Sequence, residues 1–298
     1  MTERGRVATN LLEAPQPERS DAAPAPPFER RLNWATSIPF LALQAVPLLA
    51  IFTGVSRTAL ILLACTYFGR MFFITAGYHR YFSHRSYRLG RVAQSVFAFG
   101  GLTCAQKGPL WWAGHHRNHH KFSDTDRDIH SPRDGFWWSH VGWILCDEYG
   151  ATPVDDIKDF AKYPELRWMN AHDWVGPWAL AVVCWLIGGW SGLVVGFFAS
   201  TVLLWHSTFL VNSLAHVFGR RRYETDDTSR NSLLIALVTA GEGWHNNHHR
   251  YQSSARQGFR WWQIDTTYYI LWLLSRVGIV HDLRPVPQRV IDEDHRPR

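Results

Sequence analysis

A histidine pattern that occurs twice restricts the fold of this chain more than any other feature. The spacing His-x-x-His-His begins at His116 and again at His245. Residues three and four apart lie on one face of an α-helix, so each copy is expected to direct three imidazoles at one point. A third window contains His79 and His84. These three short windows hold eight of the 16 histidines, and we interpret them together as one metal site.

The pair His79 and His84 does not fit a regular helix. At about 3.6 residues per turn, positions five apart point about 140° away from each other. The two rings converge only if the helix unwinds or ends between them, so we expect this window at the cytoplasmic end of a membrane helix. Eight imidazoles exceed the needs of one metal, and they lack the Glu-x-x-His partners of carboxylate-bridged sites. Two metals with nitrogen ligands are the expected count.

Imidazole alone does not select the metal, because zinc, copper, iron and nickel all bind it. Two zinc ions held by histidine at a membrane surface would have no evident task. A pair of redox-active irons could activate O₂ and remove hydrogen from an unactivated alkyl chain, which acid, base and nucleophilic groups cannot do. Iron is therefore our hypothesis, and the metal content of the purified protein tests it.

Apolar segments predict an all-α integral membrane protein with four crossings in two hairpins. A crossing helix needs about 20 residues to span about 30 Å of hydrocarbon. A glycine-rich turn at 188–192 separates the last two apolar segments. The predicted spans are approximately residues 38–54, 58–77, 174–188 and 193–217.

Polar segments complete the predicted domain organisation. Residues 1–30 are rich in Pro, Ala and charge, which predicts a disordered N-terminal arm. The membrane domain would cover residues 31–283, with a cytosolic helical cap formed by 78–173 and 218–283. The tail 284–298 is Pro-rich and charged, so we expect it to be flexible.

Four segments of the cap have a predicted character of their own. Residues 92–104 are apolar but too short to cross a bilayer, which predicts an interfacial or re-entrant helix. Residues 154–167 are expected to form a charged helix on the membrane surface. An apolar helix is expected at 233–239, and residues 271–280 should pack in the cap or on the membrane.

Basic residues near the spans predict the orientation, because cytoplasmic loops carry an excess of Lys and Arg. Only Arg57 would lie on the far side. Both termini and all three histidine windows are thus predicted to be cytoplasmic, in a bacterial inner membrane. The basic residues assigned to the cytoplasmic side are Arg30, Arg31, Arg80, Arg85, Arg88, Arg91, Lys158, Lys162, Arg220, Arg221 and Arg222.

Composition narrows the possible partners. The chain has 16 Trp, 17 Phe and 10 Tyr, and Trp and Tyr concentrate at membrane–water interfaces. No nucleic-acid-binding motif accompanies the net charge of +6, so we expect attraction to anionic membrane lipid and no nucleic acid. The four cysteines are widely spaced, which argues against disulfides and thiolate metal sites.

The residues that flank the histidines carry a resemblance to a known family. Across roughly residues 58–270 the sequence resembles the membrane fatty acid desaturases of the stearoyl-CoA delta-9 type. The resemblance implies a four-span helical protein whose cytosolic cap holds a di-iron centre. Such an enzyme uses O₂ and two electrons to place a cis double bond in a long acyl chain. The matching motifs are His79-Arg-Tyr-Phe-Ser-His84-Arg-Ser-Tyr, His116-Arg-Asn-His119-His120-Lys-Phe-Ser, Gly135-Phe-Trp-Trp-Ser-His-Val-Gly-Trp143, Asn212-Ser-Leu-Ala-His216 and Gly241-Glu-Gly-Trp-His245-Asn-Asn-His248-His249.

The same resemblance implies a ligand set for two Fe²⁺ ions. Asn212 would reach the second iron through a water, and His216 would be a ligand outside the three windows. Their i, i+4 spacing puts both side chains on one helix face. The nine histidines implied as iron ligands are His79, His84, His116, His119, His120, His216, His245, His248 and His249.

Two positions depart from the animal acyl-CoA enzymes. Those enzymes carry Arg-Asp immediately before the second window, where they bind the CoA head group and the start of the acyl chain. Here the positions are Gly114 and His115, and a Trp three residues before the Asn is replaced by Phe209. The acyl carrier therefore stays open between CoA, a membrane lipid and a carrier protein.

Electrons are expected from a separate protein, because the sequence contains no recognisable electron-carrier segment. A ferredoxin, or a cytochrome b5-like protein with its reductase, would fit, and a basic cytoplasmic face suits an acidic carrier. The nearest alternative function is a membrane di-iron fatty acid hydroxylase. A membrane metal transporter or haem-binding protein is a more distant alternative, because the histidines cluster outside the mid-membrane positions where transport sites lie.

A few other polar residues are candidates for supporting roles. Metal-bound histidines usually donate their second N–H to a carboxylate or carbonyl. Carboxylates that could accept this bond near the windows are Glu242, Asp124, Asp126 and Asp128. For each of them, a solvated position on the surface is the simpler expectation. Arg70 lies in a predicted span, where a charge is costly, and is expected to have a partner in the cap. Five further histidines, expected to be ordinary cap residues or to bond a carbonyl across helices, are His115, His130, His140, His172 and His206.

Overall fold

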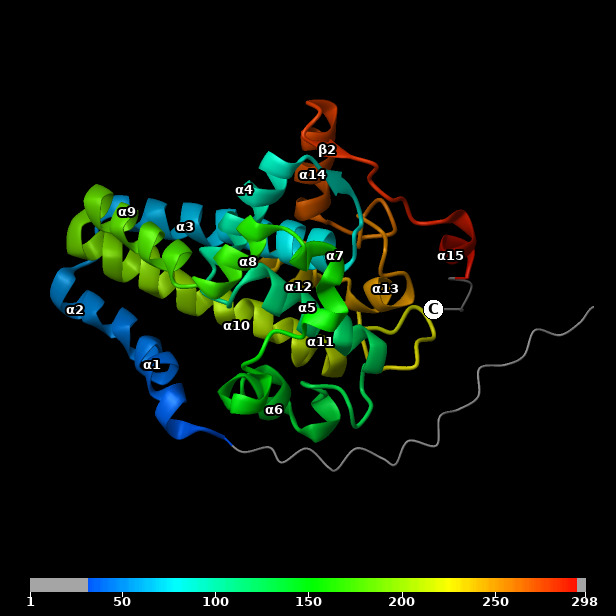
Figure 1. Ribbon diagram of the computed structural model, residues 1–298, viewed down its shortest axis with the longest axis horizontal. Coiled ribbons are helices and arrows are strands. Elements are labelled where there is room, and N and C mark those ends of the chain that lie inside the picture. Colours follow the sequence, from blue (N-terminus) through cyan, green and yellow to red (C-terminus); the bar gives the residue numbers. More distant parts are fainter. Residues whose placement is uncertain (1–31, 294–298) are drawn as a thin grey trace, which may run out of the picture.

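The protein is mostly helical (Figure 1), as seen in a computed structural model that describes residues 32–293. Within that range, strands are confined to β1 (Arg88–Leu89) and β2 (Val280–His281), which pair antiparallel with Arg88 opposite His281. The predicted helical character is thus confirmed. The arm predicted at residues 1–30 lies outside the described residues.

Two long apolar helical stretches form the extended end of the molecule (Figure 1). These stretches, Arg57–Ser83 and Val175–Val217, are long and apolar enough to cross a membrane. Their elements are α3 (Arg57–Phe72) and the π-helix η2 (Phe73–Ser83) in the first, and α9 (Val175–Ser191), the π-helix η7 (Gly192–Ala199), α10 (Ser200–Asn212) and α11 (Leu214–Val217) in the second.

The second stretch reverses direction at Gly189. This residue has φ 59° and ψ −151°, a backbone conformation that is open mainly to glycine. The chain doubles back there, so that η7 packs along both α9 and α3. The reversal falls inside the turn that the sequence predicts at residues 188–192.

A shorter apolar segment precedes these stretches and packs loosely beside them. The ring of Phe40 stacks on Trp205 of α10 at a centroid distance of 5.0 Å. Farther along, Ile51 and Phe52 are 80% and 85% exposed, as expected for side chains that face lipid rather than water. The segment consists of α1 (Trp34–Ala45), the 3₁₀ helix η1 (Val46–Leu49) and α2 (Ala50–Thr53).

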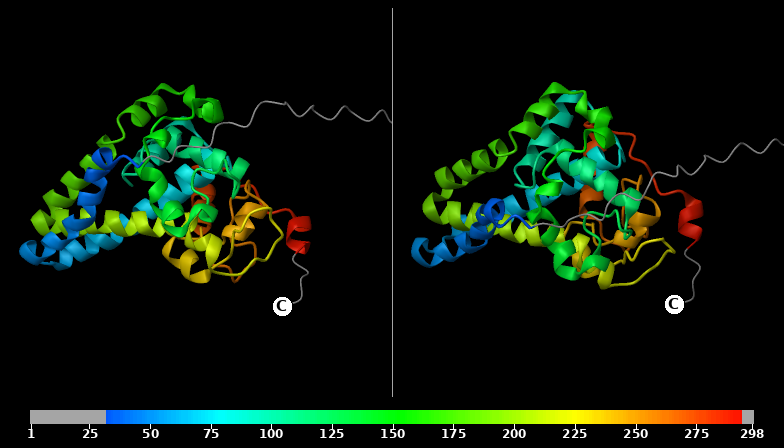
Figure 2. Two further views of the ribbon diagram at one scale, coloured as in Figure 1. Left: turned by 90° about the horizontal axis from the view of Figure 1, so that it is seen from below. Right: turned by 60° about the horizontal axis from the view of Figure 1, so that its bottom comes forward.

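Short helices and loops gather around η2 at the other end of the molecule, and Figure 2 shows this group from two further sides. The predicted helices at 92–104 and 233–239 correspond to α4 and α12. The helices are α4 (Arg91–Leu102), α5 (Pro109–Phe122), α6 (Phe136–His140), α7 (Lys158–Ala161), α8 (Pro164–Ala171), α12 (Leu233–Val238), α13 (His245–Arg250), α14 (Thr266–Arg276) and α15 (Gln288–Asp292), with 3₁₀ turns η3 (Pro132–Asp134), η4 (Gly142–Leu145), η5 (Asp147–Tyr149) and η6 (Val154–Ile157).

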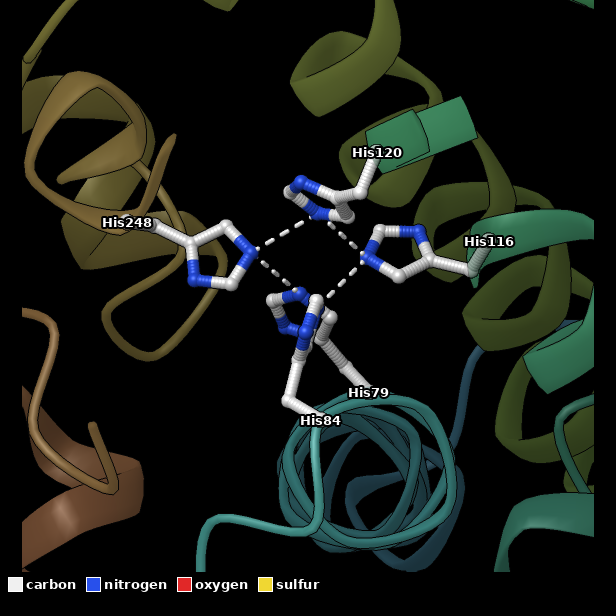
Figure 3. A group of neighbouring side chains, drawn as sticks. All are labelled: His79, His84, His116, His120 and His248. Carbon is white, nitrogen blue, oxygen red and sulfur yellow. Dashed lines mark hydrogen bonds between the residues drawn. The ribbon is translucent and has the colours of Figure 1, made fainter. Parts of the chain in front are cut away.

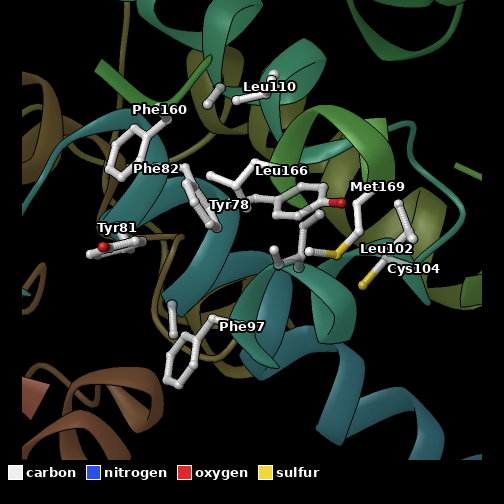
Figure 4. Packing of buried hydrophobic residues seen from close by; sticks show 14 of the residues in the cluster. Tyr78, Tyr81, Phe82, Phe97, Leu102, Cys104, Leu110, Phe160, Leu166 and Met169 are labelled. Atoms are coloured by element: carbon white, nitrogen blue, oxygen red, sulfur yellow. The ribbon is translucent and has the colours of Figure 1, made fainter. Parts of the chain in front are cut away.

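The π-helix η2 lies within the largest buried apolar cluster (Figure 4). Tyr78 and Phe82 of η2 pack edge to face at 6.3 Å between ring centroids, and Leu166 of α8 belongs to the same cluster. The Tyr78 ring also lies so close to Gly101 of α4 that an added Cβ there would come within 2.2 Å of it. This close packing holds η2, and the histidines it carries, in a fixed position.

Two predicted segments have a different form in the structure. Residues 154–167, expected to be one charged helix, are divided among η6, α7 and α8, and α7 ends at Ala161 before Pro164 begins α8. Proline restricts the residue before it to extended conformations, which prevents one continuous helix. In the tail that was expected to be flexible, residues 284–293 pack on the domain, with Val290 of α15 buried.

Arg70 is buried among the apolar helices and is paired there with hydroxyl groups. Its guanidinium donates to Ser200 Oγ at 2.5 Å and to Thr201 Oγ1 at 2.7 Å, both in α10. A weaker contact of 3.3 Å reaches the carbonyl of Thr103, at the end of α4. Only this last contact fits the expected partner in the cap. The two hydroxyl groups accept hydrogen bonds from guanidinium N–H groups, which would be costly to bury without a partner.

Gly176 provides a test of the contact between α9 and α4. An added Cβ at Gly176 would come within 2.8 Å of the backbone of Leu102, so Gly176→Ala should destabilise the protein by about 1–3 kcal/mol through overpacking. Gly69→Ala is the matched control, because Gly69 in α3 faces open space and alanine favours helix. Thermal unfolding in detergent should show a lower midpoint for Gly176→Ala only; equal midpoints would contradict the contact.

Candidate metal centre

The π-helix η2 brings the two histidines of the first window onto one side. In a π-helix each N–H bonds to the carbonyl five residues earlier, and the His84 N–H donates to the His79 carbonyl at 3.2 Å. Residues five apart therefore lie one turn apart and point in similar directions. The expectation that the helix departs from regular geometry in this window is confirmed, since it is widened throughout η2 and ends at Ser83.

Five imidazoles converge in what we call the first histidine cluster (Figure 3). One ring nitrogen from each histidine lies within 4.8 Å of the corresponding nitrogen of every other. In Figure 3, two rings rise from η2 toward a ring from α13 and two rings from α5, and all five point at a common centre. The members of the first cluster are His79, His84, His116, His120 and His248.

Four further imidazoles form the second histidine cluster. Here too, one nitrogen from each ring lies within 4.8 Å of the corresponding nitrogens of the others, and all four residues are buried. The short helix α11 contributes His216, whose Nε2 is 3.0 Å from Nε2 of His245. The members of the second cluster are His119, His216, His245 and His249.

Each His-x-x-His-His copy is divided between the two clusters. In α5 the first and last histidines join the first cluster and the middle one joins the second; in α13 the assignment is reversed. The expectation that each copy directs three imidazoles at one point is therefore wrong. Adjacent residues diverge by about 100° around a helix, so one helix supplies ligand groups to two centres at once.

The nitrogen spacing in the first cluster fits the ligands of a single ion. Two ligands at right angles around an ion, with metal–nitrogen bonds of about 2.1 Å, lie about 3.0 Å apart, whereas tetrahedral ligands lie about 3.4 Å apart. A neutral imidazole has only one N–H. A series of ring nitrogens that face one another therefore cannot all be paired by hydrogen bonds between the rings. The Nε2–Nε2 distances are 3.0 Å for His79–His248, 2.9 Å for His248–His120, 3.0 Å for His120–His116 and 3.0 Å for His116–His84.

Four imidazoles turn their other ring nitrogen, Nδ1, toward a carboxylate. Histidines that bind metal usually give this second N–H to a carboxylate or carbonyl, which fixes the tautomer and leaves Nε2 free to coordinate. Each cluster contains histidines whose Nδ1 faces a carboxylate in this way. The nitrogen–oxygen distances are 2.5 Å for His79–Glu242, 2.9 Å for His119–Asp128, 3.5 Å for His216–Asp124 and 2.6 Å for His249–Asp227.

Hydrogen bonds in turn hold these carboxylates in place. Thr228 donates its backbone N–H and its hydroxyl to Asp124, both at 2.6 Å, and Arg80 donates to Glu242 at 2.9 Å. Burial opposes ionisation of Asp124 and Asp128, but the facing imidazoles and the donors around them hold the pKa of each carboxyl well below its usual value. The site therefore carries fixed negative charge behind the imidazoles.

The sequence identified three of the four carboxylates but not their environment. Glu242, Asp124 and Asp128 are buried, so the expectation of solvated positions is wrong for them; Asp126 is exposed, as expected. Asp227 was missed because it lies 22 residues from its partner His249 in the chain. The one local signal was its place in a Thr-Asp-Asp-Thr-Ser turn segment.

Burial keeps most of these imidazoles in the neutral form that binds metal. It lowers the pKa of His116, His120 and His248 well below the usual value, and the neighbouring imidazoles lower each pKa further. Burial also lowers the pKa of His249 to about 4, although Asp227 opposes the change. His119 differs, because burial, which lowers its pKa, is outweighed by the nearby carboxylates Asp128, Asp124 and Asp227, which raise it.

A cavity of about 700 Å³ extends from the apolar helices to the first cluster. Its lining includes His116 of α5 and Asn212 at the end of α10. Asn212 thus lines the same cavity as one histidine of the first cluster. Aromatic side chains form much of the wall, including Phe40, Trp111, Trp112, Trp205 and Phe209.

The other described histidines in and near the cap have separate partners. His115 and His172 each contact a backbone carbonyl, at 3.0 Å and 2.9 Å, and are ordinary histidines as expected. The Nδ1 of His206 lies 3.0 Å from Nε2 of His140, and its Nε2 lies 3.1 Å from the side-chain amide oxygen of Gln44 in α1. His130 differs from the expectation of an ordinary cap histidine, because it is buried, lines the cavity and packs on His119 at 4.2 Å between ring centroids.

Comparison with known proteins identifies the family. The profile described as fatty acid desaturase matches residues 56–279. The chain belongs to the fatty acid desaturase family. It is therefore an oxidoreductase, in agreement with the resemblance noted from the motifs.

The relatives of this desaturase act on acyl groups held in different ways. An acyl-CoA 5-desaturase from Anemone leveillei is 40% identical over 223 residues, which cover 74% of this chain and 69% of the relative. An sn-1 stearoyl-lipid 9-desaturase from Synechocystis is 39% identical over 219 residues, covering 72% and 68%. Another from Anabaena variabilis is 36% identical over 258 residues, covering 85% and 94%.

Two positions singled out in the sequence have distinct surroundings in this desaturase. A Cβ added at Gly114 would lie 2.7 Å from Pro153, so a larger residue fits there only if the neighbouring loop shifts. Phe209 is buried and lines the cavity without a hydrogen-bond donor on its ring. Both positions therefore belong to the packing around the site.

Asp227 offers a test of the carboxylates behind the imidazoles. Asp227→Asn removes the charge that faces His249 Nδ1 while keeping the size of the side chain. We expect metal affinity and turnover to fall about 10–100-fold, the usual loss when such a partner is removed. Metal per protein after dialysis and product formation are the measurements. Asp226→Asn, at an exposed neighbour, should leave both near wild type; equal losses in the two variants would contradict the assigned role.

Proposed function

We propose that this desaturase introduces a cis double bond, at the delta-9 position, into a long saturated acyl chain. Two hydrogens leave adjacent carbons, and with two electrons and two protons from outside they reduce one O₂ to two waters. Two Fe²⁺ ions, when bound, would supply the O₂ activation that side chains alone cannot provide. The observation that carries the proposal is the convergence of nine imidazoles into two clusters in a desaturase chain.

The donor geometry supports iron over zinc. Structural zinc is almost always tetrahedral, whereas the first cluster gathers five nitrogens with neighbouring distances of 2.9–3.0 Å. This spacing suits ligands at right angles, as in the higher coordination numbers that iron adopts. The residues proposed to bind the two irons are the nine histidines of the two clusters, with Asn212 acting through a water.

The cavity supports a long apolar chain as the substrate. Its aromatic wall would exclude water along the chain, and Phe40 and Trp205 bring α1 and α10 together over it. His116 belongs to both the cavity lining and the first cluster. A methylene group in this cavity would thus lie beside the metal centre, where the bound irons could remove its hydrogen.

We further propose that the protein crosses a bacterial inner membrane four times, in two hairpins, with the cap and both termini in the cytoplasm. The apolar stretches Arg57–Ser83 and Val175–Val217 support the crossings, as do the reversal at Gly189 and the exposed apolar residues of α2. The domain would extend over residues 31–283, as the sequence suggests.

Electrons would come from a separate acidic carrier, such as a ferredoxin or a cytochrome b5-like protein with its reductase. The basic segment Arg220–Arg222 supports this, because it is fastened to the helix that carries ligands of both clusters. The backbone N–H of Arg222 donates to Asn246 of α13 at 2.7 Å. Arg220 and Arg221 are exposed, so an acidic surface docked on them would lie near the site.

The iron proposal predicts how metal content responds to loss of one ligand. His216→Ala should reduce bound iron from two to about one per protein and abolish desaturation, because the second cluster keeps only three imidazoles. His172→Ala, outside both clusters, is the control and should retain both irons. Elemental analysis and mass spectrometry of fatty acids are the measurements. A hydroxylated product from the wild type would point to a hydroxylase instead, and unchanged iron in His216→Ala would remove His216 from the ligand set.

The docking proposal predicts a specific sensitivity to charge. Arg221→Glu should raise the KM for an acidic ferredoxin by about tenfold at low salt, because steering between opposite charges is lost. The same substitution at exposed Lys162 on the cap, Lys162→Glu, is the control and should have a smaller effect. Steady-state rates at several salt concentrations measure this. A wild-type rate that does not fall with rising salt would contradict electrostatic docking.

A further inference from the structure

A buried glutamine, Gln257, lies behind the first histidine cluster in the loop between α13 and α14. Its amide nitrogen Nε2 lies 3.3 Å from Nδ1 of His79 and 3.4 Å from Nδ1 of His248. Its amide oxygen Oε1 is also buried, and no described residue donates a hydrogen bond to it. Burying a polar atom without a partner costs stability, so this side chain calls for an explanation other than packing.

His248 lacks the carboxylate partner that four other cluster histidines have. Its Nε2 belongs to the first cluster, 3.0 Å from Nε2 of His79 and 2.9 Å from Nε2 of His120. Figure 3 shows the second nitrogen of the His248 ring turned away from the other rings. That nitrogen, Nδ1, faces the amide of Gln257. Histidines that bind metal usually donate this N–H to an oxygen, and Gln257 is placed to supply one to His248.

The protons on the two rings decide which end of the amide fits between them. A neutral histidine that binds metal through Nε2 carries its proton on Nδ1, and Nδ1 of His79 already lies 2.5 Å from Glu242. The amide nitrogen of Gln257 can only donate, so it would place N–H groups against the N–H groups of both rings. Half a turn of the amide puts Oε1 in that place, where it can accept the N–H of His248.

Hydrogen bonds from the backbone hold Gln257 in this position. Its N–H donates to Asp265 at 2.7 Å, and its carbonyl accepts from Asn247 of α13 at 2.9 Å. Asp265 is paired at 2.9 Å with Arg80 of η2, which also donates to Glu242. Arg80 and Asp265 are both buried. One guanidinium thus anchors both of the groups that stand behind the first cluster on this side.

We propose that Gln257 is a positioning residue for the iron of the first cluster. Its Oε1 accepts the Nδ1–H of His248, which fixes the tautomer of that ring and keeps Nε2 directed at the metal. The proposal rests on the iron site proposed above, and it adds a support for a ligand that has no carboxylate. The cost of a buried amide with one unpaired end is then a consequence of this role.

Iron retention in two variants at this position tests the inference. Gln257→Met keeps the length of the side chain but removes the oxygen acceptor, whereas Gln257→Glu keeps an oxygen acceptor whether or not its carboxyl is ionised. The iron-loaded, full-length proteins in detergent are equilibrated with increasing amounts of a ferrous chelator, and the iron that stays bound is measured by elemental analysis.

We expect Gln257→Met to hold one of its two irons about 10–100-fold more weakly than the wild type, the usual loss when such a partner of a ligand is removed. The other iron should be held normally, because His248 belongs to the first cluster only. Gln257→Glu should hold both irons at least as tightly as the wild type. Thermal unfolding after complete removal of iron should give Gln257→Met a midpoint no lower than that of the wild type, since methionine buries no unpaired amide.

Gln94→Met is the matched control. Gln94 of α4 is also a buried glutamine, its Oε1 accepts from the hydroxyl of Tyr81, and no described residue pairs with its Nε2. This variant should retain both irons as the wild type does. Equal loss of iron from Gln94→Met and Gln257→Met would show that any buried glutamine in this region has the same effect, and would overturn the specific role of Gln257.

The remaining outcomes separate this inference from the function on which it rests. A wild type that holds two irons, together with a Gln257→Met variant that holds them equally well, would overturn the inference and leave the proposed function intact. Loss of iron from Gln257→Glu as large as that from Gln257→Met would also overturn it, because the acceptor oxygen would then make no difference. A wild type that binds no iron would overturn the proposed function and this inference with it.

Discussion

The structure depends on holding nine imidazole rings close together in two buried clusters. Such rings would repel one another if protonated, and burial lowers the pKa of most of them, as for His248. Carboxylates behind four of the rings fix the tautomer that leaves Nε2 pointing inward. Each carboxylate is anchored by other groups, as Thr228 anchors Asp124. The polar interior is thus built outward from the two clusters.

Backbone geometry makes this convergence possible. A regular helix would separate His79 and His84, and the π-helix η2 brings them together because its backbone hydrogen bonds join residues five apart. Helices α5 and α13 each contribute histidines to both clusters and so tie the two clusters together. The buried packing of Tyr78 against Gly101 holds η2 against α4. Small changes in this packing would therefore reach the first cluster, to which both histidines of η2 belong.

The sequence was informative where chemistry repeats locally and less so where the fold joins distant segments. Spacing identified the three histidine windows and required an irregular helix between His79 and His84. His216 came from the family resemblance alone, because no neighbouring histidine marks it. The division of each motif between two clusters could not be read from helical periodicity, since it depends on where the facing helix lies. Asp227 and the hydroxyl partners of Arg70 were missed for the same reason.

Anomalous diffraction at the iron edge from crystals of the purified protein tests the central claim most directly. The account predicts two iron peaks, one enclosed by the Nε2 atoms of the first histidine cluster and one by the second. It also predicts a water between the second iron and Asn212. A single peak, a peak beside His130 and Asp128 instead, or scattering that appears only above the zinc edge would contradict the account.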